Sequence, residues 1–103
     1  MVKVTVLLPM PQDLEGFARY YDEVHLPLVR ELPNVKRVSV QRVLDRQSAS
    51  APYWIAEFGF DSGDLMRQAL EGPEGQRLYA DVPNLVRFLG SEPQVLFSEE
   101  WHR

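Results

Sequence analysis

The sequence contains no cysteine, and this absence excludes several kinds of site at once. Without thiols the chain can form no disulfide framework, no thiolate zinc site, no iron–sulfur cluster and no thiol nucleophile. Its two histidines lie far apart and its carboxylates are scattered, so no metal-ligand spacing is present. A glycine-rich phosphate loop is also missing, which leaves nicotinamide and flavin cofactors without support. We therefore expect a protein with neither a metal nor a cofactor.

Clustered positive charge and long apolar runs are equally scarce. The formal net charge is −4, and Lys and Arg do not cluster as phosphate binding requires, so nucleic acid is not an expected partner. No apolar run approaches the ~18 residues of a membrane span, and the alternating residues at the start do not resemble a signal peptide. The sequence thus predicts a cytoplasmic protein that binds neither nucleic acid nor membrane.

What the chain does contain is one small domain over residues 1–103. Of these residues 45% are hydrophobic and 25% are charged, which is typical of an ordinary globular protein. A chain of this length hides only ~60–70% of its unfolded surface, so little area is left for a deep pocket. Any site is therefore expected to be small or shared between subunits.

Hydrophobic periodicity predicts a β-α-β unit in the first half of the chain. One strand of alternating residues covers positions 2–8, and a second, unusually long strand covers positions 35–46. Between them Asp13 can cap an amphipathic helix, which Pro27 is expected to kink around residues 25–27. The apolar stripe of this helix consists of Leu14, Phe17, Ala18, Tyr21, His25, Leu28 and Leu32.

The second half of the chain repeats this order of elements. A strand over 53–60 precedes a helix that Ser62 can cap, and a further helix over 74–89 is expected to break at Pro83. A last strand covers 94–97. Two such units pack as an α+β, ferredoxin-like split β-α-β plait (β-α-β-β-α-β), in which a four-stranded antiparallel sheet has helices on one face.

The other face of this sheet has no helices to cover it. It is predicted to carry apolar side chains among polar ones, namely Leu7, Val43, Tyr53, Ile55 and Val95. That apolar area is too large to leave in contact with water. We therefore expect a homodimer that forms through the sheet faces.

Three passages, spread over nearly the whole chain, are similar to one known family. They are Tyr-Tyr-Asp-Glu-Val-His-Leu-Pro-Leu at 20–28 with Leu32-Pro33, Pro-Tyr-Trp-Ile-Ala-Glu-Phe-Gly-Phe-Asp-Ser at 52–62, and Gly72-Pro73-Glu74-Gly75-Gln76 with Glu99-Glu100. In these passages the chain resembles the EthD family of the dimeric α+β barrel superfamily. The resemblance implies a homodimer whose two sheets close into a barrel, with a small cavity in each subunit between sheet and helices. Superfamily relatives include cofactor-free monooxygenases, lactone isomerases, polyketide cyclases and haem-degrading enzymes, so the fold alone does not select a reaction.

His25 is the leading candidate for a catalytic residue, because it is a titratable group in the middle of the apolar stripe. A histidine there can titrate near neutrality and act as a general acid or base. Tyr21 lies one turn earlier on the same face and could orient His25 or donate a hydrogen bond to a substrate oxygen. The competing interpretation is a core imidazole that Tyr21 or a carbonyl freed by Pro27 satisfies, with Tyr21 serving only for packing.

Five further residues are candidates for binding the substrate. Phe17, Trp54, Phe58 and Phe88 are aromatic residues expected to line the cavity around His25, although an aromatic set at strand spacing is more often simply core. Arg42 is two and four residues from Val40 and Val38, so it is expected on the same face of the strand. There it could bind a carboxylate or phenolate at the cavity mouth. For Arg42 an ordinary surface position on the strand is the competing interpretation.

These residues lead to one main functional hypothesis and two alternatives. The first is a small cofactor-free enzyme, oxidoreductase-, monooxygenase- or isomerase-like, in degradative or secondary metabolism, with His25 as general acid/base on a small hydrophobic metabolite. One alternative is a non-catalytic protein that binds a small ligand or supports a partner oxidase. The other is a haem-binding protein that uses His25 as the iron ligand.

Overall fold

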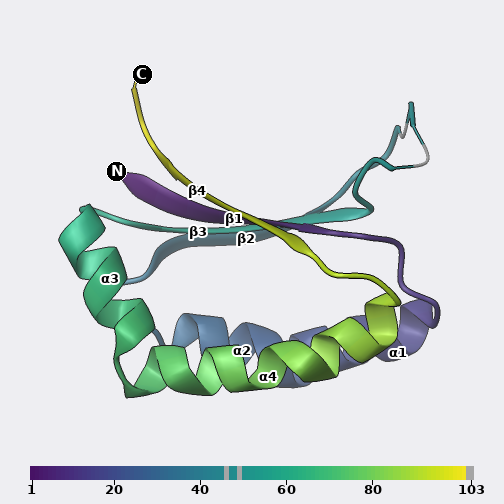
Figure 1. Cartoon of the computed structure of the whole chain (residues 1–103), viewed down its shortest axis with the longest axis horizontal. Helices are drawn as coiled ribbons and strands as arrows, with labels where there is room; N and C mark the ends of the chain where they lie inside the picture. Colours follow the sequence, from purple (N-terminus) through teal and green to yellow (C-terminus); the bar gives the residue numbers. More distant parts are fainter. Residues whose placement is uncertain (46, 49, 102–103) are drawn as a thin grey trace.

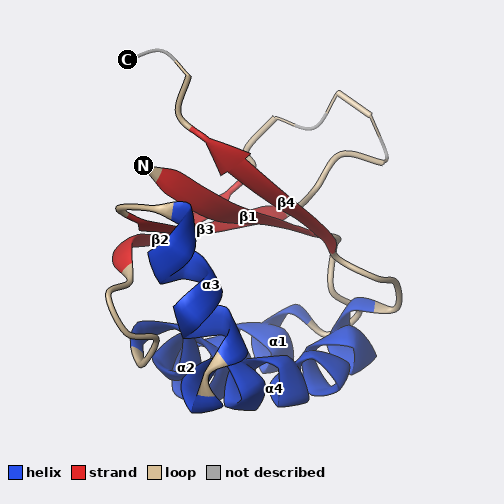
Figure 2. Ribbon diagram, turned by 60° about the vertical axis from the view of Figure 1, so that its left-hand side comes forward, coloured by secondary structure: helices blue, strands red, loops and turns tan. Residues whose placement is uncertain are grey.

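A computed structural model describes residues 1–45, 47–48 and 50–101 of the chain. Its strands form one antiparallel sheet in the order β2-β3-β1-β4, and all helices lie on one side of that sheet (Figures 1 and 2). This is the expected α+β, ferredoxin-like plait. The strands are β1 (Val2–Leu8), β2 (Lys36–Arg42), β3 (Trp54–Phe60) and β4 (Gln94–Glu99).

The helices begin and end at residues whose chemistry suits those positions. They are α1 (Leu14–Tyr20), the π-helical turn η1 (Tyr21–His25), α2 (Leu26–Arg30), α3 (Gly63–Glu71) and α4 (Pro73–Leu89). Asp13 caps α1 by accepting a hydrogen bond from the Gly16 N–H at 3.0 Å, and Ser62 caps α3 as predicted. Gly90 ends α4 with φ of 72°, a backbone conformation that glycine adopts without strain.

The irregularity of the first helical segment begins earlier than the predicted kink at residues 25–27. The N–H of Leu26 donates to the carbonyl of Tyr21, which makes Tyr21–His25 a π-helical turn, and Pro27 then stands at the start of α2. The turn is wider because Pro27 has no N–H to continue the regular α-helical pattern.

This π turn determines which side chains of the segment are buried. In an α-helix, steps of four residues drift by about 40° around the axis, and one wide turn offsets that drift. The buried residues are therefore spaced four apart, at Phe17, Tyr21, His25 and Val29. The predicted stripe was wrong at Leu14, which is 39% exposed, and it left out Val29, which is buried; Leu28 is partly buried and packs against the core.

Three predicted boundaries also differ from the structure. Helix α4 continues through Pro83 without a break, since both Pro83 and Tyr79 are exposed and the unpaired carbonyl of Tyr79 can bind water. Strand β2 ends at Arg42 rather than reaching position 46, because β3 begins only at Trp54; one more backbone hydrogen bond follows, from the Val43 N–H to the carbonyl of Tyr53 at 2.8 Å. Arg46 itself lies outside the described residues. Strand β4 extends two residues further than predicted, to Glu99.

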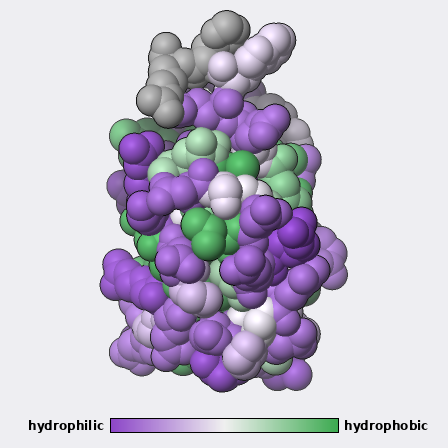
Figure 3. Space-filling model, turned by 90° about the vertical axis from the view of Figure 1, so that its left-hand side faces the viewer, coloured by the Kyte–Doolittle hydropathy of each residue, from purple (hydrophilic) through white to green (hydrophobic). Residues whose placement is uncertain are grey.

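Two clusters of buried side chains fill the space between the sheet and the helices. The first contains Val4, Val29, Leu32, Phe58, Phe60, Ala69 and Leu78, and the second contains Leu8, Phe17, Tyr21, Ala56, Leu85 and Leu89. The helix-facing side of β3 is thus the predicted one. At the end of the molecule that carries α3, hydrophilic side chains surround only a small hydrophobic patch (Figure 3).

The prediction for Val95 was wrong. Val95 lies opposite Val6 in the β1–β4 pair, and Val6 packs against the core, so Val95 faces the helices. Its neighbour Leu96, opposite Thr5, lies on the face without helices instead. The alternation of side chains along a strand does not tell which sheet face each one occupies when the register against the next strand is unknown.

A search for membrane-crossing segments in the described ranges finds no helix with the length and apolar character that crossing requires.

Candidate functional site

His25 lies at the end of the π turn, where it faces α4. Only 8% of the residue is exposed, and its Nδ1 atom lies 2.9 Å from Oδ2 of Asp81. Asp81 is itself 7% exposed. The partner of the buried imidazole is therefore an acid far along the chain, and neither Tyr21 nor a carbonyl freed by Pro27 takes that place.

Within the described ranges, three side chains hold Asp81 by hydrogen bonds. Its Oδ1 atom accepts hydrogen bonds from the hydroxyl of Tyr20 and, at 3.0 Å, from Nδ2 of Asn84. Both carboxylate oxygens are thereby occupied, one by His25 and the other by Tyr20 and Asn84. This arrangement fixes the carboxylate and, through it, the orientation of the His25 ring.

The protonation states follow from burial and from these hydrogen bonds. Burial acts to raise the pKa of Asp81, but the hydrogen bonds from Tyr20, Asn84 and His25 together outweigh it and lower that pKa. Burial lowers the pKa of His25, and Asp81 only partly offsets this effect. Near neutral pH the pair is thus a carboxylate that accepts from a neutral imidazole. Because a carboxylate only accepts hydrogen bonds, Nδ1 carries the proton and Nε2 carries the free electron pair.

Tyr21 stands beside this pair, with its ring centroid 5.3 Å from that of His25. Burial, with a smaller effect from Asp22, raises the pKa of Tyr21 to about 12. Its hydroxyl therefore stays protonated at neutral pH and can donate a hydrogen bond. Within the described residues the only side-chain hydrogen bond to either ring is the one at Nδ1 of His25, so the Tyr21 hydroxyl and His25 Nε2 are both available.

Tyr21 and His25 line a cavity of about 100 Å³ between the sheet and α4. The other lining side chains are Val4, Val6, Leu8, Val29, Ala56, Phe58, Leu70, Leu78, Tyr79, Val82, Leu85, Pro93, Val95 and Phe97. Three of these, Tyr79, Val95 and Phe97, are 53%, 46% and 57% exposed, so the cavity opens to solvent between α4 and β4. The result is a basic nitrogen and a hydroxyl donor in an apolar chamber with one open side.

Only one of the five residues predicted to bind substrate reaches this chamber. Phe58 lines it, whereas Phe17, Trp54 and Phe88 form an aromatic group next to it. Phe17 lies at the centre of that group, with ring centroids 5.6 Å from Trp54, 6.3 Å from Phe88 and 5.7 Å from Tyr21. Phe17 therefore supports Tyr21 from behind.

Arg42 lies in a different part of the molecule. Together with Leu14, Ala18 and Trp54 it lines an open groove between α1 and the β2 edge of the sheet. The structure does not bring Arg42 together with His25.

The most important residue that sequence reasoning missed is Asp81. Its signal was present in the sequence, since it interrupts the apolar spacing of Leu78 and Leu85 on α4, where an acid should be costly. Tyr20 was not predicted to belong to the site, although its hydroxyl donates to Asp81.

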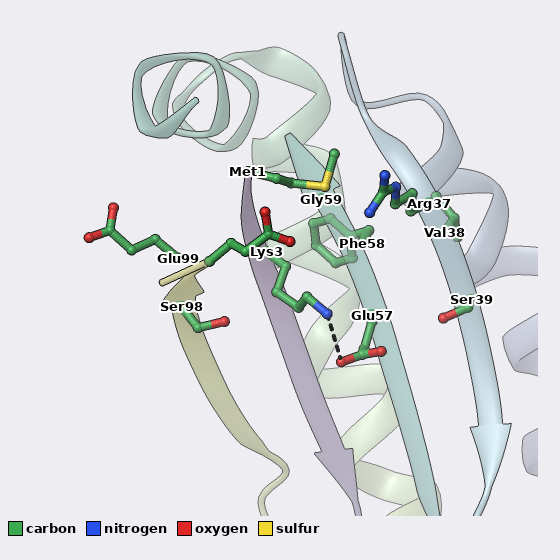
Figure 4. Close-up of a pocket in the computed structure, with 11 residues that line it drawn as sticks. Met1, Lys3, Arg37, Val38, Ser39, Glu57, Phe58, Gly59, Ser98 and Glu99 are labelled. Carbon is green, nitrogen blue, oxygen red and sulfur yellow. Dashed lines mark ion pairs between the residues drawn. The ribbon is translucent and has the colours of Figure 1, made fainter. Parts of the chain in front are cut away.

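A second hollow lies on the face of the sheet opposite the helices. Its volume is about 420 Å³, and its lining includes Lys3, Arg37, Ser39, Glu57 and Ser98 (Figure 4). Nζ of Lys3 lies 3.6 Å from Oε2 of Glu57. The two cavities are separated by the sheet, so this charged hollow is not part of the His25 chamber.

In the described part of the chain, no group of three or more His, Asp or Glu side chains is arranged to hold a metal ion.

Comparison with known proteins gives one family and several similar structures. The EthD domain matches residues 10–88. An uncharacterized 11.0 kDa protein from the thcB–thcC intergenic region of Rhodococcus erythropolis is 36% identical over 102 residues, covering 97% of this chain and 95% of its own. The crystal structure of an EthD family protein from Bacillus halodurans has a TM-score of 0.84 and 27% identity, covering 98% of this chain and 99% of its own.

Two less similar structures share the fold. SnoaB of Streptomyces nogalater, a cofactor-independent oxygenase, has a TM-score of 0.68 and 15% identity, covering 99% of this chain and 94% of its own. A dimeric protein of ferredoxin-like fold from Bacteroides fragilis has a TM-score of 0.65 and 14% identity, covering 96% of this chain and 95% of its own.

Proposed function

The chain belongs to the EthD domain family, and we propose that it is a small cofactor-independent enzyme in which His25 acts as general acid/base on a small hydrophobic metabolite. One observation carries the proposal. A buried imidazole is held by a carboxylate through Nδ1, while Nε2 and the hydroxyl of Tyr21 stay available in an apolar cavity. A neutral imidazole whose other nitrogen is bound to a carboxylate is well suited to accept a proton.

The chemistry begins with the transfer of one proton. Nε2 of His25 takes a proton from a C–H next to a carbonyl, or from a hydroxyl, and leaves an enolate or phenolate. Asp81 stabilises the imidazolium that results, because its carboxylate already accepts from Nδ1. The Tyr21 hydroxyl donates to the developing oxyanion, which is worth most in a cavity that excludes water.

The proton and electrons then have two possible destinations. In an isomerase, the imidazolium returns the same proton to another carbon of the enolate, so that substrate and product have the same composition. In an oxygenase, dioxygen is the co-reactant, a CH₂ group becomes a carbonyl, and the second oxygen atom leaves as water. The second course is supported by the structural similarity to SnoaB, a cofactor-independent oxygenase.

Exchange of carbon-bound hydrogen tests the proton transfer without knowledge of the natural substrate. Cyclohexanone in D₂O should exchange its α-hydrogens faster with the protein than without it, as followed by proton NMR. His25→Asn should lower that acceleration by about 10²–10⁴, the usual contribution of a general acid/base. Dioxygen uptake measured in parallel separates an oxygenase from an isomerase.

A control variant is Arg42→Gln, since Arg42 lies in the separate groove and should not affect exchange. Circular dichroism establishes that each variant is folded. Exchange by folded His25→Asn at the wild-type rate would contradict the acid/base role and favour a protein that only binds its ligand. The haem alternative is disfavoured by size, because a chamber of about 100 Å³ is smaller than the ~150 Å³ that holds a benzene molecule.

We also propose that two copies associate through the sheet faces that lack helices. Leu7 and Ile55, which lie opposite each other in the β1–β3 pair, share that face with Leu96, which is 43% exposed. Val43 and Tyr53 were predicted there too, but they lie outside the paired strands, and Tyr53 lines the Arg42 groove. Burial of Leu7, Ile55 and Leu96 favours association. The similar protein from Bacteroides fragilis is described as dimeric, which supports association into a dimer.

A further inference from the structure

The lining of the His25 chamber restricts the charge of any ligand. Among the residues that the structure describes, no charged side chain lines it, and its polar side chains are those of Tyr21, His25 and Tyr79. Tyr79 stands at the exposed opening, with 53% of its surface in solvent, while Tyr21 is 4% exposed and His25 is 8% exposed. An ion that entered this space would lose its hydration without an opposite charge in return. The ligand that fits is therefore neutral, with a polar group at one end only.

The Tyr21 hydroxyl and Nε2 of His25 restrict the kind of polar group that the ligand can carry. The Tyr21 hydroxyl is a donor at neutral pH, and Nε2 of His25 is an acceptor when Nδ1 donates to Asp81. Neither atom has a hydrogen-bond partner within the described residues, where the fully buried side-chain atom without a partner is Nε1 of Trp54, so the Tyr21 hydroxyl and His25 Nε2 are both reached from the open chamber. A ligand that enters displaces water from both groups, so a ligand atom that bonds to both is favoured. The oxygen of a hydroxyl group does this, because it accepts from one group and donates to the other.

The volume restricts the body of the ligand. A dry cavity of ~150 Å³ holds one benzene molecule, and the chamber here measures about 100 Å³. The enclosed space therefore takes no more than one six-membered ring, and the part of that ring opposite the hydroxyl, with any substituent on it, extends into the opening between α4 and β4. Tyr79 and Phe97 stand at that opening and present aromatic rings to whatever emerges.

We propose that the chamber binds a neutral single-ring phenol or cyclic enol, with the hydroxyl inward against Tyr21 and His25 and the opposite ring position facing out between Tyr79 and Phe97. The inference rests on the proposed function, because it identifies the substrate class of the same site. It adds the size limit, the orientation and the residues at the opening. Fused three-ring compounds with the oxygen on the middle ring are excluded, since the outer rings prevent that oxygen from entering.

Binding measured by calorimetry tests this proposal without any turnover. The probes are 4-ethylphenol, 4-ethyltoluene, which lacks the hydroxyl, and anthrone, which has three rings. We expect 4-ethylphenol to bind at least about tenfold more tightly than 4-ethyltoluene, as one good hydrogen bond provides, and anthrone not to bind. Tyr21→Phe should weaken the binding of 4-ethylphenol and leave the affinity for 4-ethyltoluene unchanged. Equal affinity for these two probes, or binding of anthrone, would overturn the proposal.

A pair of matched substitutions locates the binding. Ala56→Leu fills the chamber and should abolish 4-ethylphenol binding, whereas Ala18→Leu makes the same change in the Arg42 groove and should have no effect. Should Ala56→Leu fail to fold, Val82→Phe narrows the same chamber from the half-buried side of α4. Binding that survives in folded Val82→Phe and disappears in Ala18→Leu contradicts the location.

The outcomes for ligand class and for catalysis are separable. Binding of 4-ethylphenol without exchange of cyclohexanone hydrogens would reject the enzyme proposal and leave the ligand class standing. Exchange that depends on His25, with no binding of 4-ethylphenol, would reject the ligand class and leave the enzyme proposal standing.

Discussion

At the scale of single residues, the chemistry of this chain depends on how Asp81 is held. A carboxylate with 7% exposure is unfavourable unless its charge is satisfied, and Tyr20, Asn84 and His25 supply three hydrogen bonds to it. The arrangement keeps the acid ionised and the imidazole neutral. Each of the two groups is thereby in the form that general base catalysis at Nε2 requires.

Asp81→Asn is predicted to shift the pH dependence of the reaction to lower pH. Burial lowers the pKa of His25, while Asp81 acts to raise it, so removal of the carboxylate lowers that pKa further. The rate, which rises with pH as His25 loses its proton, should then reach its plateau at a lower pH. The plateau itself should fall by roughly 10- to 100-fold, because a hydrogen bond to the developing imidazolium is lost. NMR titration of the His25 ring and a pH–rate profile measure both effects.

The control for this prediction is Asn84→Ala, which removes a partner of Asp81 but none of His25. Because Asp81 keeps its carboxylate in this variant, the pKa of His25 should not fall as it does in Asp81→Asn. A His25 pKa that rises in Asp81→Asn would contradict the account.

Sequence reasoning could identify His25 but not its partner. His25 and Tyr21 lie one turn apart, so their proximity follows from the helical repeat alone. Asp81 belongs to a helix that comes much later in the chain, and only the packing of α4 against η1 brings it to Nδ1. For Arg42, the alternation of side chains along the strand correctly indicated the helix-facing side of the sheet. That alternation could not show which groove on this side Arg42 lines.

At the scale of elements, the junction of α3 and α4 depends on a glycine. A Cβ atom on Gly75 would lie 2.0 Å from the carbonyl oxygen of Leu70, and this neighbour is backbone that cannot turn aside. The close approach lets α4 begin directly after α3 ends. The sequence marks Gly72-Pro73 as a helix boundary. The need for a glycine at position 75 depends on the close approach of Leu70, which helix propensity does not reveal.

Gly75→Ala is predicted to destabilise the protein by more than the ~1 kcal/mol that alanine gains over glycine in a helix. Gly63→Ala is the matched substitution, because a Cβ there meets nothing within 4 Å. It should raise the free energy of unfolding by roughly 0.4–1 kcal/mol through a less flexible unfolded chain. Urea denaturation measures both values, and a stabilised Gly75→Ala would show that the junction can move apart.

Prediction of the elements succeeded where the local signal was sufficient. Ser62 and Gly90 mark helix ends that the structure retains, because a cap and a left-handed residue act within one turn. The predicted break at Pro83 was wrong because the carbonyl that loses its hydrogen bond there faces solvent and can bind water. The predicted face of Val95 was wrong because it depends on the register of β4 against β1.

At the scale of the whole molecule, a single chain leaves one side of its sheet without cover (Figure 1). That side is divided along the strands. Leu7 and Ile55 lie toward one end, and Lys3, Glu57 and Ser98 lie toward the other (Figure 4). Two copies that meet with their apolar ends together leave their charged ends facing each other, where Lys3 and Glu57 offer both signs of charge.

Ile55→Glu is predicted to convert the dimer to monomers. It places a carboxylate in the apolar end of the interface, where its desolvation has no opposite charge to compensate it. Sedimentation velocity at micromolar concentration should show a dimer for the wild type and a monomer for the variant. Gln68→Glu on α3 adds the same charge on an exposed helix and should stay dimeric. A monomeric wild type would reject the proposed association.

The pairing of β1 with β4 has a consequence for how the chain folds as it is synthesised. β1 is the first strand made and lies inside the sheet, yet one of its neighbours is the last, with Val2 opposite Glu99. Contacts so distant along the chain form slowly, because a long loop must close before they contribute. While the ribosome is still adding residues, β1 can pair only with β3. The opening through which a ligand reaches His25 therefore acquires its β4 side last, only when translation of this segment is complete.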